Sequence, residues 1–146
     1  MQLNQATDYG FRVVLYLSCR PPGSIISGQV IAQEQRIPVR FLQKIMRQLT
    51  LAGLTRSYRG IEGGFALLKA PQEISLLDVV TAMEGPVSIQ RCLEDTAECS
   101  RQCANHCSVH RALDRVQQTL LDGLTAVTFD RLAAEEMAKK EENKDE

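Results

Sequence analysis

Residues 40–67 read RFLQKIMRQLTLAGLTRSYRGIEGGFAL, and this stretch decides the fold of the chain. Its first part has apolar residues at the spacing i, i+3, i+4, i+7, which is typical of an amphipathic helix, with polar residues on the opposite face. The apolar positions are Leu42, Ile45, Met46 and Leu49, and the polar positions are Arg40, Gln43, Lys44 and Arg47. We therefore expect a helix over residues 39–51, followed by Gly53 in the usual place just past a helix C-terminus.

The second part of the stretch predicts a β-hairpin. Residues 54–58 and 65–68 are strand candidates, and a glycine-rich turn that begins at Arg59 joins them. Gly60, Gly63 and Gly64 suit the backbone of a turn, and small residues there would also allow another molecule to approach the backbone closely. A phosphate-binding loop is not expected, because no strand-to-helix nucleotide motif surrounds these glycines.

Two helices are expected before this stretch. Residues 6–19 have helical apolar spacing and are followed by a Pro-Pro-Gly break, and Ser27 is a candidate N-cap for a short helix over residues 28–35. That helix and the basic helix, separated by Ile37-Pro38, form a helix-turn-helix. A helix-turn-helix followed by a hairpin is a winged helix, in which the third helix enters the major groove and the wing reaches the backbone or minor groove.

The polar face of the third helix has the chemistry of a DNA reader. Arginine can pair with guanine edges, glutamine with adenine, and lysine or arginine with phosphates. Alone, such a stripe more often marks a solvated helix face, but here it comes in order with a turn and a basic wing. Residues 1–80 hold nine Lys and Arg against five Asp and Glu, whereas residues 81–146 hold eight against thirteen. The positive half therefore coincides with the winged helix, which favours a polyanionic partner.

Beyond the wing, a short helix capped by Ser75 is expected over residues 76–83, and Gly85-Pro86 ends it. A long helix is expected from about Asn105 or Ser108 to Val127, and a last short helix through Met137. The long helix presents an apolar seam that suits a partner helix, made of Val109, Leu113, Val116, Leu120, Leu124 and Val127. A helix placed after a complete domain more often pairs with its symmetry mate, which predicts a homodimer.

The expected fold class is mainly α: a winged helix-turn-helix domain with a two-stranded wing, plus a long C-terminal dimerisation helix. We divide the chain into a winged-helix domain at 1–85, a cysteine-rich loop at 86–108, the dimerisation helix and a short terminal helix at 109–137, and a disordered charged tail at 138–146.

The loop collects four of the five cysteines in the pattern C-x6-C-x3-C-x3-C-x2-H. The donors are Cys92, Cys99, Cys103, Cys107 and His110. Thiolates are soft ligands that suit zinc, copper(I) or iron–sulfur clusters, so the loop is a candidate metal site. Two disulfides, or three cysteines that share a helix face at i, i+4, i+8, are the alternatives. Four thiolates could also form a closed structural zinc site.

Composition narrows the class of protein further. The 146 residues contain no apolar run long enough for a membrane span and no secretory signal, so a cytoplasmic protein is expected, in which disulfides rarely persist. Cys19 is taken as a small buried apolar residue. We find no nucleotide fingerprint and no nucleophile paired with a base. An enzyme or electron carrier is therefore not expected.

The chain resembles the IscR/NsrR-type winged-helix transcription regulators, a bacterial family whose cluster-binding members sense iron–sulfur supply, nitric oxide, iron or redox state. The resemblance covers residues 1 to about 133 and rests on four segments. These are LNQATDYGFRVVLYL, RFLQKIMRQLTLAGLTRSYRGIEGGFAL, ISLLDVVTAMEG and the cysteine loop that runs into CSVHRAL. It implies a dimer whose long helices cross and whose third helices each read half of a palindromic double-stranded operator, often as a repressor.

The resemblance also implies roles for single residues. Gln43 lies where the best-studied cluster regulator has a glutamate that tunes site choice, and Arg59 matches the wing arginine. Cys92, Cys99 and Cys107 match the three cluster cysteines. His110 matches the fourth ligand of a two-iron cluster in one branch, and Asp8 matches a carboxylate that reaches the four-iron cluster of the partner subunit in another.

Cys103 departs from the family's pattern, so that Cys103, His110 and Asp8 compete for the remaining ligand position. Two-iron and four-iron clusters both accept all-cysteine ligation, so the cluster type stays open. A cysteine-metabolism repressor of the same fold, which lacks a cluster, is a further alternative that the four loop cysteines disfavour.

Overall fold

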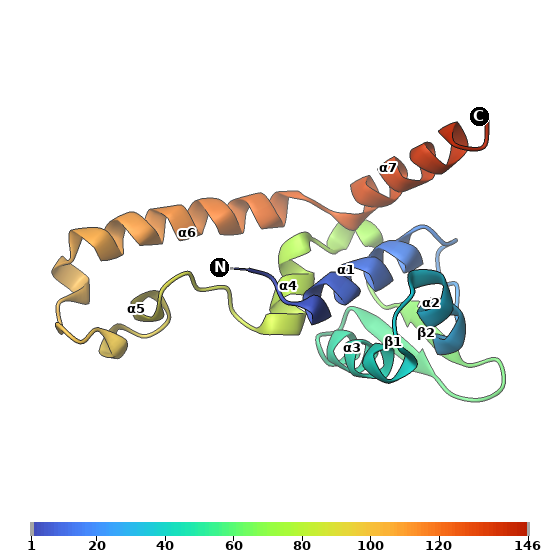
Figure 1. Ribbon diagram of the computed structural model, residues 1–146, viewed down its shortest axis with the longest axis horizontal. Coiled ribbons are helices and arrows are strands. Elements are labelled where there is room, and N and C mark those ends of the chain that lie inside the picture. Colours follow the sequence, from blue (N-terminus) through green and yellow to red (C-terminus); the bar gives the residue numbers. More distant parts are fainter. Residues whose placement is uncertain (1, 146) are drawn as a thin grey trace.

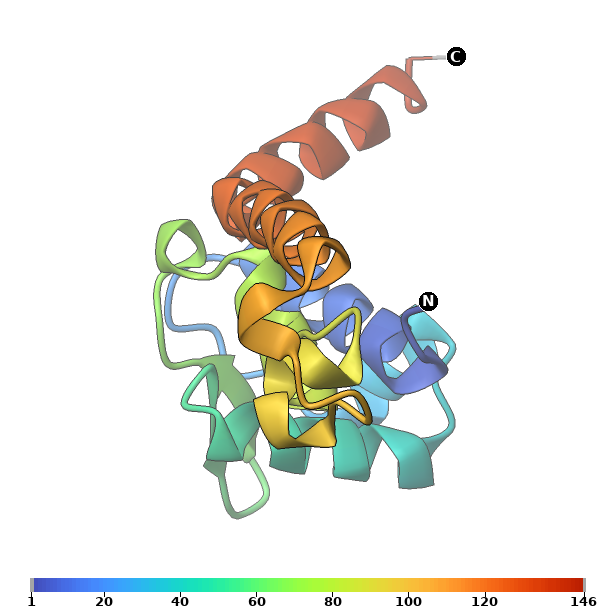
Figure 2. The same ribbon diagram turned by 90° about the vertical axis from the view of Figure 1, so that its left-hand side faces the viewer.

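The computed structural model describes residues 2–145, and it consists of a helical body with a wing and an arm that extends from it (Figure 1). The ends of the first and last predicted segments, Met1 and Glu146, lie outside the described residues. The body contains α1 (Gln5–Ser18), α2 (Gly28–Gln35), α3 (Val39–Leu51), β1 (Thr55–Tyr58), β2 (Gly64–Leu67) and α4 (Leu76–Glu84). Figure 2, which views the molecule along the arm, shows α1 and α4 between α3 and the C-terminal helices.

The core of the body forms where α1, α3 and α4 meet. The apolar face of α3 lies in the core, where Leu42, Ile45, Met46 and Leu49 are all buried. They pack with residues from α1 and α4, such as Val13, Val14 and Val79. Burial of a large aliphatic side chain is worth about 1.5–3 kcal/mol, so this cluster fixes the position of α3. The sequence prediction of the α3 faces is confirmed.

The helix-turn-helix has the expected caps. The Ser27 side chain accepts a hydrogen bond from the Val30 amide, as predicted for the N-terminus of α2. That helix ends at Gln35, and the C-cap residue Arg36 has a φ of 54° in the left-handed region. The turn is then closed by the Ile37 amide, which donates to the Ala32 carbonyl over 2.9 Å. This short turn sets α3 at an angle to α2.

The wing is a two-stranded antiparallel sheet in which Thr55 pairs with Leu67 and Tyr58 pairs with Gly64. Phe65 also exchanges two backbone hydrogen bonds with Ile26, which ties the wing to the segment before α2. Gly64 is required at this contact, because a Cβ there would lie 2.3 Å from the Ile26 carbonyl oxygen. The wing is therefore attached to the body at its base and also along β2.

The arm contains the cysteine loop and a long helix. The loop is less irregular than expected, because it includes α5 (Arg91–Glu94) and the short 3-10 turns η2 (Thr96–Glu98) and η3 (Ala104–His106). The long helix α6 (Ser108–Ala126) begins at one of the two expected positions. At 1.5 Å per residue, its length is about 28 Å.

Helix α7 (Phe129–Glu142) returns to the body and packs on α1. The prediction of a disordered tail from residue 138 is wrong for residues 138–142, which continue this helix. Glu135 and Glu136 precede Lys139 and Lys140 by four residues, a spacing that stabilises helices. Lysines near a helix C-terminus also suit the helix dipole, and these effects explain the extension.

Phe129 anchors α7, since its side chain is 1% exposed and its amide donates to the Ile74 carbonyl over 2.9 Å. We expect Phe129→Ala to lower the free energy of unfolding by about 3–5 kcal/mol, because it leaves a cavity between α7 and the core. Urea denaturation would measure this loss. Phe129→Leu is the control and should cost less than about 1.5 kcal/mol if packing is the cause. Equal stability of Phe129→Ala and the wild type would contradict this role.

Candidate DNA-binding face and cysteine loop

The outer face of α3 presents the four residues that the sequence singled out. Arg40, Gln43, Lys44 and Arg47 are all exposed. The Arg40 guanidinium lies 5.1 Å from the centre of the Phe41 ring, which is itself 40% exposed. Stacking on an aromatic ring limits the motion of the arginine and leaves its outer edge free to donate hydrogen bonds.

The wing carries a second basic group of the same domain. Arg59 is exposed at the start of the turn. Gly60 has a φ of 104°, and its carbonyl accepts from the Gly63 amide over 3.0 Å. A Cβ at Gly63 would lie 2.4 Å from the Tyr58 carbonyl oxygen, so glycine is needed there for the turn itself. The glycines thus serve turn geometry, as expected, while Arg59 faces solvent.

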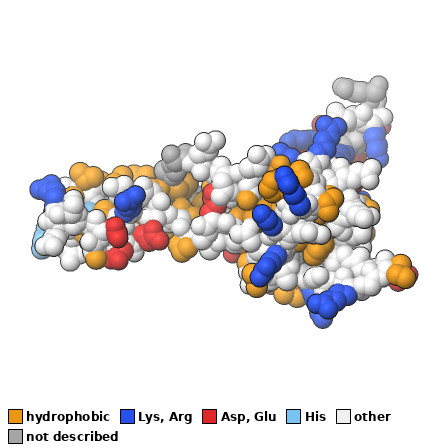
Figure 3. All heavy atoms as spheres, turned by 60° about the horizontal axis from the view of Figure 1, so that its bottom comes forward, with side chains coloured by type: hydrophobic (Ala, Val, Ile, Leu, Met, Phe, Trp, Pro, Cys, Tyr) orange, Lys and Arg blue, Asp and Glu red, His pale blue; other side chains and the backbone are white. Residues whose placement is uncertain are grey.

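Two arginines that the sequence reasoning missed add charge to the same domain. Arg36 is exposed at the turn between α2 and α3, and Arg56 is exposed on β1 with its guanidinium 5.3 Å from the Tyr58 ring centre. Figure 3 shows Lys and Arg side chains spread over the surface of the body near α3 and the wing. The signal available in the sequence was the outward register of β1, which places Arg56 and Tyr58 on one side of the strand.

The cysteine loop lies at the end of the arm (Figure 1). All five cysteines are free thiols, and the four in the loop are partly buried. They do not share a helix face, because Cys99, Cys103 and Cys107 flank separate short turns. The interpretation of these residues as one face of a helix is therefore wrong.

Donor groups of the loop meet in pairs. The Nδ1 atom of His110 lies 3.3 Å from the Cys92 sulfur. Farther along the loop, the thiols of Cys99 and Cys103 lie near enough for each to affect the pKa of the other. Within residues 2–145, no three His, Cys, Asp or Glu side chains are placed to hold one metal ion together.

Of Cys99 and Cys103, Cys99 has the more polar surroundings. Backbone amides of Cys103, Arg101 and Gln102 donate to it, and these bonds lower the pKa of the Cys99 thiol. Gln102 permits this arrangement, because its φ of 51° turns the chain back towards Cys99. In contrast, desolvation raises the pKa of Cys103. Cys99 is thus the thiol of this pair that deprotonates first.

The N-terminus of α6 adds a favourable field for an anionic group. Cys107 is the N-cap residue of this helix, its side chain makes no capping hydrogen bond, and the first turn contains no acidic residue. The partial positive charge at a helix N-terminus stabilises thiolates and other anions. His110 belongs to the same first turn.

Asp8 lies elsewhere. It is on α1 in the body, where its carboxylate forms an ion pair with Arg12 at 2.7 Å, whereas the loop is at the end of the arm. Within one chain the structure does not bring Asp8 to the cysteines.

An iron–sulfur cluster, which the sequence resemblance implies, fits the donors of the loop. Four thiols and one imidazole are the ligands that such clusters use, and amides that donate to sulfur are typical of their surroundings. The donors lie within 19 residues of sequence. Binding would require the pairs to draw together, and metal binding commonly orders such loops.

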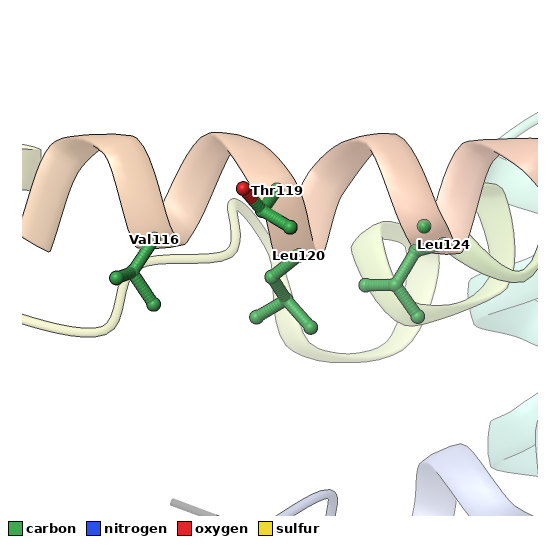
Figure 4. Close-up of a pocket in the computed structure, with 5 residues that line it drawn as sticks. Val116, Thr119, Leu120 and Leu124 are labelled. Carbon is green, nitrogen blue, oxygen red and sulfur yellow. The ribbon is translucent and has the colours of Figure 1, made fainter.

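The apolar seam of α6 is only partly covered within residues 2–145. None of its side chains is buried, although the helix contacts α4 and α5, and Val109 and Val116 are 65% and 58% exposed. A shallow trough of about 480 Å³ runs along it, lined by Val116, Thr119, Leu120, Gly123 and Leu124. Figure 4 shows Val116, Leu120 and Leu124 pointing from the same side of the helix. Within the described part of the chain, no helix is both long and apolar enough to span a membrane.

A basic third helix, a basic wing and a long helix with an open seam define the class of winged helix-turn-helix regulators. The sequence model of the Rrf2 family, described as an iron-dependent transcriptional regulator, matches residues 3–135. The chain therefore belongs to the Rrf2 family of transcriptional regulators, which confirms the resemblance found in the sequence.

Individual relatives agree on the fold. The HTH-type transcriptional regulator NsrR of Shouchella clausii is 34% identical over 100 residues, which are 68% of this chain and 67% of NsrR. The structure of CymR, the global cysteine regulator of B. subtilis, has a TM-score of 0.69 and 27% identity and covers 92% of this chain and 97% of its own. The structure of IscR from T. potens has a TM-score of 0.70 at 23% identity, covers 94% of this chain and 90% of its own, and supports the fold alone. The chain spans 56% to 67% of the length of the first curated relatives that it matches.

Proposed function

We propose that this chain is a dimeric transcription regulator that binds a palindromic double-stranded operator under the control of an iron–sulfur cluster in the cysteine loop. The observation that carries the proposal is the exposed polar face of α3, whose opposite apolar face is buried, together with the exposed Arg59 of the wing in the same domain. A helix of this kind fits the major groove, and its Arg, Gln and Lys residues can contact base edges and phosphates.

Dimerisation would use the seam of α6. In a twofold dimer the same seam on each chain meets the other, which covers side chains such as Val116 that water now surrounds. Two third helices would then face two half-sites of one duplex, so a palindrome is the expected operator.

The cluster would be held by donors from Cys92, Cys99, Cys103, Cys107 and His110, with Asp8 of the partner subunit as a further candidate. When bound, the cluster supplies chemistry that responds to electrons, oxygen and nitric oxide. This chain's own residues would transmit the response, because the loop connects α4 to α6. The Ile89 amide donates to Gln117 Oε1 over 2.9 Å, which ties the start of the loop to the middle of α6.

A change in the loop would therefore alter how α6 sits on α4. Because α4 packs against both α1 and α3, the separation and tilt of the two third helices would change with it. This is a local switch with a distant effect, as in other regulators that couple a bound group to a packed helix.

The first test is selection of duplexes from a random pool by the anaerobically purified chain, followed by footprinting. We expect enrichment of a palindrome whose half-sites are separated by about one helical turn or a multiple of it. No enrichment over the starting pool would contradict the DNA-binding part of the proposal.

Arg59→Ala should weaken binding to the selected duplex and lower the slope of log K against log salt by about 1, if Arg59 neutralises one phosphate. Fluorescence anisotropy at several salt concentrations would measure both. Lys139→Ala, which removes a positive charge from α7, is the control and should leave the slope unchanged. An unaltered slope in Arg59→Ala would rule out the phosphate contact.

A structural zinc site or a cluster-free regulator is the second candidate. The likeness to the cysteine regulator CymR favours the cluster-free regulator of these two. Zinc thiolate sites are colourless, so an absorption spectrum of the anaerobically purified chain, with iron and sulfide counts, separates these candidates from an iron–sulfur protein.

A further inference from the structure

A pocket lies on the body between the start of α1 and one side of α3, two segments that are close together in Figure 1. Its volume is about 350 Å³. Both helices line it, with Gln5, Ala6 and Tyr9 from α1 and Phe41, Lys44, Ile45 and Gln48 from α3. Because Lys44 also belongs to the exposed polar face of α3, the pocket borders the face that we assign to DNA.

The α3 side of the pocket is a flank of the helix, between its polar face and its buried face. At 3.6 residues per turn, Phe41 and Gln48 lie about two turns apart on one line along the helix. That line is about a quarter of a turn from the centre of the polar face and about as far from the centre of the buried face. Phe41 is 40% exposed and Gln48 is half-buried, as expected at the edge of the core.

A helix in the major groove meets the DNA backbone with its flanks. The groove is about 12 Å wide, and a helix with its side chains has a diameter of about 10–12 Å. The polar face can therefore reach base edges only when the flanks lie against the sugar–phosphate chains that line the groove. On the flank that contains Phe41 and Gln48, the backbone would meet the pocket and the start of α1.

The side chains of the pocket suit a sugar–phosphate chain. Lysine, glutamine and tyrosine side chains are common donors to phosphate oxygens in protein–DNA complexes. Lys44 and Gln5 are exposed, so both can donate to a phosphate without losing a partner in the core. The partly exposed ring of Phe41 supplies apolar surface for a deoxyribose.

The charge around the pocket is positive. The Arg40 guanidinium lies 5.1 Å from the centre of the Phe41 ring, and the Arg12 guanidinium lies 5.3 Å from the centre of the Tyr9 ring. The carboxylate of Asp8 offsets one of these charges, because it forms an ion pair with Arg12 at 2.7 Å. Together with the lysine of the pocket, the cations outnumber this carboxylate, which favours an anionic occupant.

We propose that the pocket between α1 and α3 receives the sugar–phosphate backbone at one wall of the major groove. Lys44 and Gln48 of α3 and Gln5 of α1 donate to phosphate oxygens, so that α1 helps to fix the register of the third helix on the duplex. Lys44 is then a backbone contact and not a reader of bases. This inference rests on the proposed function, because it adds contacts to the same operator.

The test compares the selected operator with a random-sequence duplex, by fluorescence anisotropy at several salt concentrations. Lys44→Gln should weaken binding to both duplexes by a similar factor of about ten and lower the slope of log K against log salt by about 1. Gln48→Ala should weaken both by about fivefold and keep the slope, because it removes a donor that carries no charge. Gln72→Ala is the matched control. Gln72 is exposed on the turn η1 (Pro71–Glu73), outside the pocket, so its loss should change neither affinity.

Operators that carry a single methylphosphonate locate the contact on the DNA, since this change replaces one charged phosphate oxygen by a methyl group. At one position in each half-site, the methylphosphonate should weaken binding of the wild type by about tenfold. At that position it should have little further effect on Lys44→Gln, because the two changes remove the same contact. Circular dichroism checks that each variant folds.

Three results would overturn the proposal. Lys44→Gln might lose affinity for the operator alone and keep its affinity for the random duplex, which would assign Lys44 to the bases. Wild-type affinities in Gln48→Ala would exclude the flank of α3 from the backbone contact. Additive losses in Lys44→Gln at every methylphosphonate position would show that Lys44 contacts no phosphate. A wild type that selects no duplex would instead refute the proposed function, so the two failures are distinguishable.

Discussion

Replacing Cys92, Cys99 and Cys107 together by alanine is expected to remove the iron and to change operator affinity by about tenfold or more. The loop joins α4 to α6 and is tied to α6 through the bond between Ile89 and Gln117, so loss of the bound group should release the position of α6. Fluorescence anisotropy with the selected duplex, at one salt concentration, would measure the change in affinity. Circular dichroism would check that the variant and the wild type fold equally.

The control for this triple variant is Cys19→Ala. Cys19 caps α1 near the Ala133 carbonyl, where burial raises the pKa of its thiol, and it lies outside the loop. It should keep the iron and the affinity. If the iron-free triple variant bound the duplex as tightly as the iron-loaded wild type, the loop would have no part in controlling DNA binding.

Val116→Glu is expected to weaken the dimer by at least a hundredfold. Each chain would lose the burial of the exposed part of one valine, worth about 1 kcal/mol, and the two copies together give about 2 kcal/mol. Placing two carboxylates in an apolar seam adds a further cost. Because Val116 is 58% exposed in the single chain, the fold of the monomer should survive. Sedimentation equilibrium would measure the dissociation constant, and operator affinity should fall with it.

Gln118→Glu is the matched control, because it adds the same charge two residues away on the opposite face of α6. Gln118 donates to Asp122 over 2.9 Å and is exposed, so the variant should lose little beyond that bond. A Val116→Glu chain that remained dimeric at the wild-type concentration would place the dimer interface somewhere other than the seam of α6.

The sequence predicted the winged helix well, because its signals are local. The apolar period of α3, the caps at Ser27 and Ser75 and the glycine turn after Arg59 each depend on a few neighbouring residues. The apolar seam of α6 could also be predicted, since the spacing of its apolar residues by three and four is visible in the sequence without knowledge of the partner. Local patterns of this kind specify both an element and the face that it buries.

The parts that were missed depend on contacts between distant residues. Helix α7 packs on the body because the Phe129 amide donates a hydrogen bond to the Ile74 carbonyl and the Leu76 amide donates one to the Val127 carbonyl. No local pattern in the sequence shows these contacts. The pairing of Cys92 with His110 spans 18 residues and follows from how α5 meets α6. The sequence spacing identified five possible donors. Which of them lie close together depends on turns such as the one at Gln102, whose backbone is left-handed.

The most direct test of the account is to measure operator affinity of the wild-type chain before and after the cluster is removed, and again after it is rebuilt with iron and sulfide. Anisotropy at fixed salt should show a change of about tenfold or more on removal, and the original affinity should return on reconstitution. Equal affinity in all three states would contradict control of DNA binding by the cysteine loop.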